Sequence, residues 1–266
     1  MKISKLGFGV AGALSIPTVE AIAARADALG MATLWFNETL DGDALSRVAT
    51  AQAVSKQLVI GVGVINLDAK NPALIAKNLA SRGVDTSRLI LGIGASRKPS
   101  PLATVSNGLQ ALRSLLPSPV VVGSLGPKMR QLGAEQGDGL LFNWLPPEFA
   151  GETTEVLRKQ AAAAGNAAPI AATYVRTALG SAALPVLQQE AAKYSAIPSY
   201  AANFSRLGIT AMDGAVWGQT PEEVRTGLKK FDGTVDHVVV RAITAKEEVE
   251  HYLELLEAVA PLTVTA

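Results

Sequence analysis

Eight short apolar runs, separated by segments with helical periodicity, are the feature that most constrains the fold of this 266-residue chain. The runs are nearly continuous in apolar and β-branched residues, which is typical of parallel strands buried on both faces. They cover residues 6–10, 33–36, 58–64, 89–92, 120–122, 139–142, 170–175 and 237–241. Eight repeated strand–helix units predict an α/β fold, the closed (β/α)8 TIM barrel.

The segments between the runs carry helix signals. Thr220-Pro221-Glu222-Glu223 has the residues of a capping box, and Thr244 with Glu247 repeats the pattern before the last helix. Residues 180–216 have helical periodicity with a break around Ile197-Pro198, which predicts an extra helical excursion before the last βα unit. Because no linker interrupts the pattern, we expect residues 1–266 to form a single domain.

The composition narrows the range of functions. The net charge is +1 and no block of basic residues occurs, which argues against a nucleic-acid partner. The chain has no cysteine and two histidines, so disulfides and thiolate nucleophiles are excluded and no metal site is expected. The lack of cysteine is compatible with a reducing cytoplasm, where we expect the protein to work.

The N-terminus has two interpretations. Lys2 and Lys5 precede an apolar run at residues 6–16, a pattern found in signal peptides. The alternative, which the helical spacing from Val19 to Gly30 favours, is a strand followed by a helix of the mature fold. No apolar run reaches the ~18 residues that a membrane span requires, and no membrane partner is expected.

Active sites of eight-stranded barrels lie on the loops that follow the strands. The third, fourth and fifth strands end in glycine-rich sequence, which indicates close approach of a ligand to the backbone. The turn at residues 123–127 leads into a helix with Lys128 in its first turn, so free amides and an ammonium would form a phosphate site. The alternative is that these glycines are needed for steric reasons alone.

Four groups of residues occur in an order and spacing that resemble the luciferase-like flavin and deazaflavin oxidoreductases. The likeness covers nearly the whole chain, and each group by itself is a modest match. The groups are residues 34–38; residues 60–66 with Asn71-Pro72-Ala73; residues 88–94; and residues 121–129 with Gly137-Asp138-Gly139.

The resemblance implies an enzyme with coenzyme F-420, or alternatively FMN, at the carboxyl ends of the strands. It implies a non-prolyl cis peptide behind the ring, for which Gly63-Val64 is the candidate because glycine lacks side-chain bulk. The implied cofactor-binding residues are Gly63, Val64, Asn66, Gly94, Ala95, Ser96, Gly123, Ser124, Leu125, Gly126, Pro127, Phe142, Asn143 and Trp144.

The sequence departs from the family at the end of the second strand. Many members have a histidine there, whereas this chain has Glu38 and Thr39. Glu38, beside Asn37, is the candidate for proton transfer; alternatively, it accepts a hydrogen bond or caps the next helix. Three further residues are candidates for substrate binding, although an arginine at a barrel rim also pairs structurally with carboxylates. They are Trp35, Arg176 and Arg241.

The connection between the fourth and fifth strands is short, since about twenty residues separate Arg97 from Val120. An open site would shield a reactive oxygenated flavin poorly from water. This favours hydride transfer between a deazaflavin and a small organic substrate. The alternatives are an FMN-dependent monooxygenase or reductase, a non-catalytic flavin-binding protein, and a cofactor-free phosphate-binding isomerase barrel. The resemblance also implies a homodimer.

Overall fold

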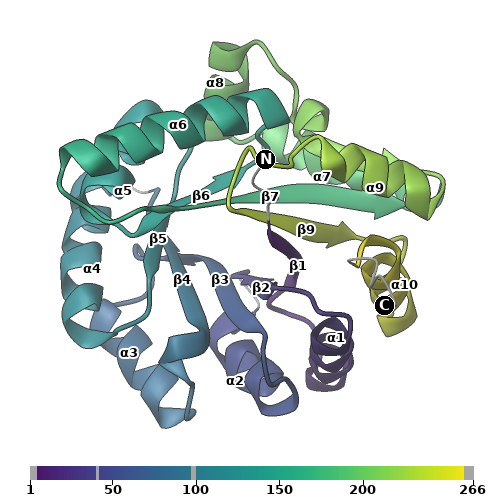
Figure 1. The fold of residues 1–266 in the computed structure, drawn as a ribbon, viewed down its shortest axis with the longest axis horizontal. Helices are drawn as coiled ribbons and strands as arrows, with labels where there is room; N and C mark the ends of the chain where they lie inside the picture. Colours follow the sequence, from purple (N-terminus) through teal and green to yellow (C-terminus); the bar gives the residue numbers. More distant parts are fainter. Residues whose placement is uncertain (1–4, 40–41, 97–99, 261–266) are drawn as a thin grey trace.

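The computed structural model describes residues 5–39, 42–96 and 100–260, and these residues form a closed parallel barrel surrounded by helices (Figure 1). Strands follow one another around it in the order β6-β5-β4-β3-β2-β1-β9-β7, and pairing of β6 with β7 closes the ring. The predicted TIM barrel is confirmed. Arg97 lies outside the described residues. The strands are β1 (Lys5–Ala11), β2 (Thr33–Asn37), β3 (Val59–Asn66), β4 (Leu89–Gly94), β5 (Val120–Gly123), β6 (Gly139–Asn143), β7 (Ile170–Leu179), β8 (Ala215–Gly218) and β9 (His237–Ile243).

The helices form the outer layer, and several begin where the sequence predicts. Thr220 caps α9 by accepting a hydrogen bond from the Glu223 amide, as expected. The capping box predicted at Thr244 is wrong: α10 begins later, and the Thr244 hydroxyl donates to the Lys246 carbonyl instead. The helices are α1 (Ile16–Ala28), α2 (Ala44–Val54), α3 (Pro72–Ser81), α4 (Pro101–Leu115), α5 (Pro127–Gln136), α6 (Pro147–Ala163), α7 (Leu184–Ser195), α8 (Pro198–Leu207), α9 (Pro221–Lys229) and α10 (Val249–Val259).

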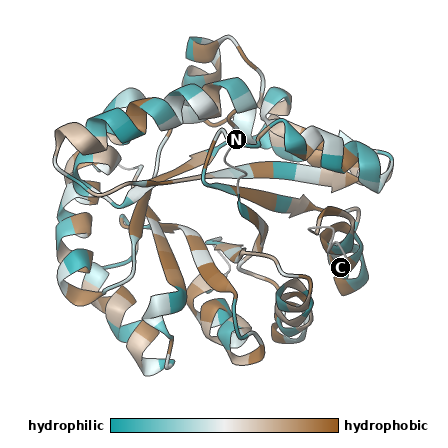
Figure 2. Cartoon of the chain, viewed as in Figure 1, coloured by the Kyte–Doolittle hydropathy of each residue, from teal (hydrophilic) through white to brown (hydrophobic). Residues whose placement is uncertain are grey.

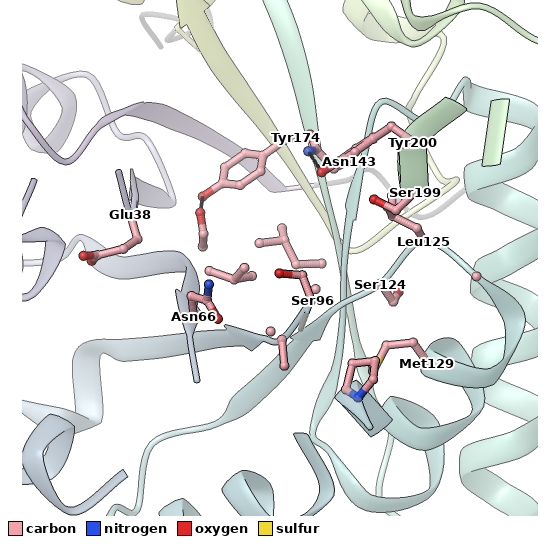
Figure 3. Close-up of a pocket in the computed structure, with 18 of the residues that line it drawn as sticks. Glu38, Asn66, Ser96, Ser124, Leu125, Met129, Asn143, Tyr174, Ser199 and Tyr200 are labelled. Atoms are coloured by element: carbon pink, nitrogen blue, oxygen red, sulfur yellow. Dashed lines mark hydrogen bonds between the residues drawn. The ribbon is translucent and has the colours of Figure 1, made fainter. Parts of the chain in front are cut away.

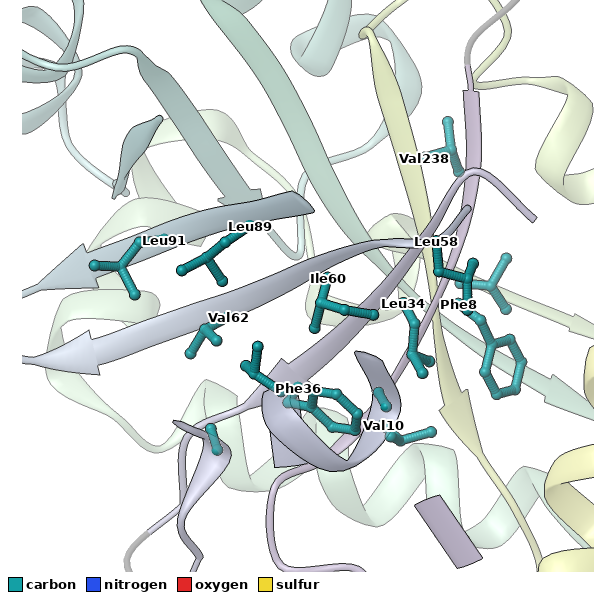
Figure 4. Close-up of a cluster of buried hydrophobic side chains, with 14 of the residues drawn as sticks. Phe8, Val10, Leu34, Phe36, Leu58, Ile60, Val62, Leu89, Leu91 and Val238 are labelled. Atoms are coloured by element: carbon teal, nitrogen blue, oxygen red, sulfur yellow. The ribbon is translucent and has the colours of Figure 1, made fainter. Parts of the chain in front are cut away.

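Alternation along the strands produces two apolar cores, because successive side chains point to opposite faces. Residues such as Phe8, Leu34 and Ile60 point outward and pack under the helices (Figure 4). The barrel interior is filled by a smaller set that includes Trp35 and Tyr174. Apolar residues accordingly run through the strands while polar residues lie on the helices (Figure 2). The barrel interior is therefore packed with side chains, and the place left for a cavity is at the carboxyl ends of the strands.

The excursion before the last βα unit is confirmed. It consists of α7, α8 and a short 3-10 helix, η2 (Ala211–Gly214). It leads into β8, a strand that the sequence analysis missed. β6 pairs with residues 170–174 of β7, and β8 pairs with residues 176–179. Since β7 is ten residues long and β6 only five, β8 occupies an edge that β6 leaves free.

The N-terminal apolar run belongs to β1 and α1, as the second interpretation predicts. β1 pairs in parallel with both β2 and β9, so it is an integral strand of the barrel. Among the described residues, none of the helices has the length and apolar character needed to cross a membrane.

Candidate active site

A cavity of about 490 Å³ opens at the carboxyl ends of the strands (Figure 3). Its position agrees with the rule for barrel enzymes. The third-strand residues and the turn before α5 contribute to this one cavity, as the sequence analysis requires. Its lining residues in the described part of the chain are Asn37, Glu38, Gly63, Val64, Asn66, Gly94, Ala95, Ser96, Pro101, Gly123, Ser124, Leu125, Gly126, Met129, Leu141, Asn143, Tyr174, Tyr194, Ser199 and Tyr200.

One wall of the cavity is built around Val64. The Gly63-Val64 peptide bond is cis, as predicted, and the register of β3 against β4 shifts between Val62 and Ile65. A Cβ on Gly92, Gly94 or Gly123 would lie 3.3, 3.1 or 2.7 Å from the Val64 methyl groups. These three glycines and Val64 are called the glycine wall. The glycines make room for Val64, which in turn presents its surface to the cavity.

Two further glycines, both in β3, leave room for side chains that pack inside the barrel. A Cβ on Gly61 would lie 2.1 Å from the Trp35 ring, and one on Gly63 would lie 2.4 Å from Leu141 and 2.5 Å from the Tyr174 hydroxyl. The interpretation that glycine-rich strand ends indicate a ligand is thus wrong for Gly61, whose missing side chain accommodates Trp35.

The turn between β5 and α5 has the features of an anion site. Gly126 is the N-cap of α5 and provides no side-chain hydrogen bond, so amides of the first helical turn lack a capping partner. The Ser124 hydroxyl is buried and has no hydrogen-bond partner within the part of the chain that the structure describes. A Cβ on Gly126 would meet nothing within 4 Å, which indicates open space above the turn. Lys128 is exposed and does not line the cavity. Backbone amides and Ser124, rather than an ammonium, would therefore bind a phosphate.

The end of β2 places Glu38 at the cavity in an ion pair. Its Oε1 accepts from Lys70 Nζ at 2.6 Å, and its Oε2 accepts from the Ala44 amide at the start of α2. Both partners are donors, which suits an ionised carboxylate and favours the helix-capping interpretation over proton donation. Asn37 also lines the cavity, and its buried Oδ1 has no hydrogen-bond partner among the described residues.

A second wall comes from β6, β7, α7 and α8. We call it the aromatic wall and define it as Asn143, Arg176, Tyr194 and Tyr200. The Arg176 guanidinium is 1% exposed and donates to Glu190 Oε1 at 3.1 Å, to Asn143 Oδ1 and to the Tyr194 hydroxyl at 3.0 Å. It also lies over the Tyr194 ring, at 4.8 Å. Asn143 Nδ2 donates to the Tyr200 hydroxyl at 2.6 Å (Figure 3).

The structure brings most of the predicted site residues together. Thirteen of them line the cavity: Asn37, Glu38, Gly63, Val64, Asn66, Gly94, Ala95, Ser96, Gly123, Ser124, Leu125, Gly126 and Asn143. Six do not: Trp35, Pro127, Phe142, Trp144, Arg176 and Arg241.

Pro127 is the first residue of α5, and the other five residues lie away from the cavity for identifiable reasons. Trp35 fills the barrel interior, where its Nε1 donates to Thr33, and Phe142 points outward into the helix-packed core. Trp144 packs against the excursion. Arg176 and Arg241 are neighbours in the register of β7 and β9. Burial lowers the pKa of Arg241, and Arg176 pairs with Glu190, in line with the structural alternative.

The sequence analysis did not predict seven of the lining residues, namely Pro101, Met129, Leu141, Tyr174, Tyr194, Ser199 and Tyr200. Tyr194, Ser199 and Tyr200 come from α7 and α8, and Tyr174 comes from the barrel interior. The aromatic residues near the break at Ile197-Pro198 were the available signal, but only the tertiary structure shows that they return to the cavity. Among the described residues, no cluster of three or more His, Asp or Glu side chains could hold a metal ion.

Fold and site together define a barrel with a cavity that combines an uncapped turn at the start of α5 and an irregularity in β3. In a comparison with known proteins, a family model described as luciferase-like monooxygenase matches residues 98–206 of this chain. The 5,10-methylenetetrahydromethanopterin reductase of Methanolobus tindarius is 25% identical over 179 residues, which are 54% of each chain. The chain thus spans about half the length of this relative. The predicted resemblance to the luciferase-like family is confirmed.

Solved structures confirm the fold. An F-420-dependent secondary alcohol dehydrogenase in complex with an F-420–acetone adduct superposes with a TM-score of 0.76 and 15% identity, covering 98% of this chain and 100% of that one. The oxygenating constituent of 3,6-diketocamphane monooxygenase from Pseudomonas putida, in complex with FMN, gives a TM-score of 0.65 and 13% identity, covering 98% and 97%. At these identities the likeness concerns the fold alone.

Proposed function

We propose that this chain is an oxidoreductase that binds coenzyme F-420 in the cavity and transfers a hydride between it and a small organic substrate. One observation carries the proposal: Val64 of the glycine wall and the uncapped turn with Ser124 line the same cavity. A flat ring with a phosphorylated tail has both chemistries, an apolar face and an anionic end. When bound, such a cofactor supplies the hydride acceptor or donor.

The residues of the chain would share the work of binding. Val64 offers an apolar surface to a ring, and the free amides after Gly126 with the Ser124 hydroxyl would hold a phosphate. The unpartnered Oδ1 of Asn37 would accept a hydrogen bond from a bound ligand, which removes the cost of leaving it buried and unsatisfied. Gly94, Ala95 and Ser96 line the cavity between these groups.

Glu38 has a positioning role in this proposal. Its two contacts link the end of β2 to Lys70 and to the start of α2. The variant Glu38→Gln keeps the shape and one acceptor oxygen, so we expect turnover to fall by no more than about threefold, against the ~100-fold or greater loss typical of a missing proton donor. A loss of the larger size in steady-state kinetics would return Glu38 to a catalytic role.

F-420 is preferred to FMN because the connection from β4 to β5 is short and α4 begins at Pro101, which itself lines the cavity. An open cavity suits hydride transfer better than protection of an oxygenated flavin. The second candidate is an FMN-dependent monooxygenase or reductase, which the likeness to the FMN-bound monooxygenase structure supports.

Fluorescence titration of the purified protein with each cofactor tests the proposal. We expect F-420 to bind at least tenfold more tightly than FMN, a difference of about 1.4 kcal/mol. Tighter binding of FMN would favour the second candidate, and binding of neither would overturn both. Binding of F-420 without substrate-dependent turnover would instead indicate a storage protein.

We further propose that residues 1–266 act as one domain in a cytoplasmic homodimer with a small-molecule substrate and without a nucleic-acid or membrane partner. The family resemblance supports the dimer, and the lack of cysteine and the net charge of +1 support the rest. Sedimentation equilibrium of the purified chain would test the dimer, and a monomeric mass at micromolar concentration would contradict it.

A further inference from the structure

The buried guanidinium of Arg176 sets the direction of a hydrogen-bond chain. Arginine has only donors, so every oxygen bonded to it must accept. Asn143 therefore presents its Oδ1 to Arg176 and its amide nitrogen to Tyr200. The Asn143 amide cannot be flipped without placing two donors face to face inside the protein.

The direction continues to Tyr200. Its hydroxyl accepts from Asn143 Nδ2 at 2.6 Å, so its own proton points elsewhere, and within the described residues no group accepts it. Tyr200 lines the cavity. Tyr174 offers a contrast, because it also lines the cavity but its hydroxyl donates to the Gly63 carbonyl at 3.4 Å. The free O–H of Tyr200 is thus a donor available to a ligand.

The Tyr194 hydroxyl is oriented by Arg176 in the same way, but without an intervening side chain. This hydroxyl accepts directly from Arg176, and the Tyr194 ring lies 4.8 Å from the Tyr200 ring, centroid to centroid. Two phenol donors oriented by one buried cation form a site that favours an oxygen carrying partial negative charge.

We propose that the Tyr200 hydroxyl donates a hydrogen bond to an oxygen atom of the substrate, which assigns small ketones and aldehydes, or the corresponding alcohols, as the substrate class. Asn143 and Arg176 are positioning residues in this arrangement. The inference deepens the proposed function and rests on it for the reaction. Burial and then the neighbouring Tyr194 raise the pKa of Tyr200 to about 12, so the donor proton stays in place at neutral pH.

The test uses acetophenone as a carbonyl probe. Infrared spectra are recorded for the probe with wild-type protein, with and without F-420, and with the variants Tyr200→Phe and Tyr252→Phe. Tyr252 is a buried tyrosine of α10 outside the cavity lining and serves as the matched control. We expect the carbonyl stretch to move to higher frequency in Tyr200→Phe and to stay unchanged in Tyr252→Phe. A third variant, Asn143→Leu, should give an intermediate frequency.

Kinetics provide the second arm. With acetophenone as substrate, Tyr200→Phe should lower kcat about 100-fold with little change in KM, as for removal of a donor to a developing negative charge.

Equal carbonyl frequencies in wild type and Tyr200→Phe would overturn the inference. Should Tyr200→Phe fail to fold, wild-type chain carrying 3-fluorotyrosine, a more acidic phenol, must show a larger shift to lower frequency, and an unchanged shift would overturn the inference. Failure of F-420 to bind wild type would instead overturn the proposed function.

Discussion

Residues of the glycine wall and of the aromatic wall line the same cavity, with Gly92 and Arg176 behind them, but the two walls are supported by different interactions. Val64 is supported by missing side chains, since Gly92, Gly94 and Gly123 leave it room. Tyr200 is supported by a buried charge, since Arg176 orients it through Asn143. The glycine wall depends on steric space and the aromatic wall on satisfied hydrogen bonds. Substitutions should therefore damage the two walls by different mechanisms and to different extents.

The largest expected effect is on the aromatic wall. Arg176→Leu would leave Glu190, Asn143 and Tyr194 without their shared donor, so we expect the free energy of unfolding to fall by about 3–5 kcal/mol. Urea denaturation measures the change. Arg25→Ala is the control, because the pair of Arg25 with Glu257 is exposed and should contribute only about 0–1 kcal/mol. Equal costs for the two variants would show that the Arg176 network stabilises nothing.

The next effect concerns the glycine wall. In Gly123→Ala the new Cβ would lie 2.7 Å from Val64 Cγ1. We expect a loss of about 1–3 kcal/mol from overpacking. Val64→Ala in the same chain should restore part of it, with a coupling of about 0.5–3 kcal/mol in a double-mutant cycle. The control Gly126→Ala meets no atom within 4 Å and should cost less than Gly123→Ala, about 0.5 kcal/mol for the less favourable N-cap residue. Strict additivity would refute the steric account.

A smaller effect separates ligand binding from stability. Ser124→Ala removes a buried hydroxyl without a partner, so the protein should unfold at the same or a higher denaturant concentration. F-420 affinity should fall by about 1 kcal/mol, roughly fivefold, by fluorescence titration. Ser114→Ala, at the C-terminal end of α4 and thus at the opposite end of the barrel, should change neither. A loss of stability without a loss of affinity in Ser124→Ala would remove Ser124 from the anion site.

The last expected effect is confined to alkaline pH. The pKa of Tyr200 is raised from 10.0 to about 12, so the unfolded chain loses this proton first as the pH rises. The contribution of Tyr200 to stability is complete below pH 10 and declines between pH 10 and 12. The thermal unfolding temperature should therefore fall less steeply with pH across that range for Tyr200→Phe than for wild type. Parallel curves would mean that Tyr200 titrates normally in the folded state.

The sequence analysis predicted all eight strands that close the barrel but missed β8. The eight runs can be recognised in the sequence because a strand covered on both faces must be apolar throughout. β8 is the four-residue segment Ala215–Gly218 on an edge beyond the closed ring, and its Trp217 is 41% exposed. Such a segment has no periodic signal. Its pairing depends on β7 extending past β6, which is a property of the assembled sheet.

The sequence by itself determined the barrel, the helical excursion and the turn before α5, because each follows from local patterns of burial, capping and backbone space. The cis peptide at Gly63 was expected only from the resemblance to the luciferase-like family. Only the tertiary structure decided that Arg176 is an internal support, that Trp35 occupies the space left by Gly61, and that Tyr194 and Tyr200 return to the cavity. The reason is physical. Local patterns determine which side chains must be buried and where the backbone must turn. The partner of a buried polar group, in contrast, is set by contacts between segments far apart in the chain.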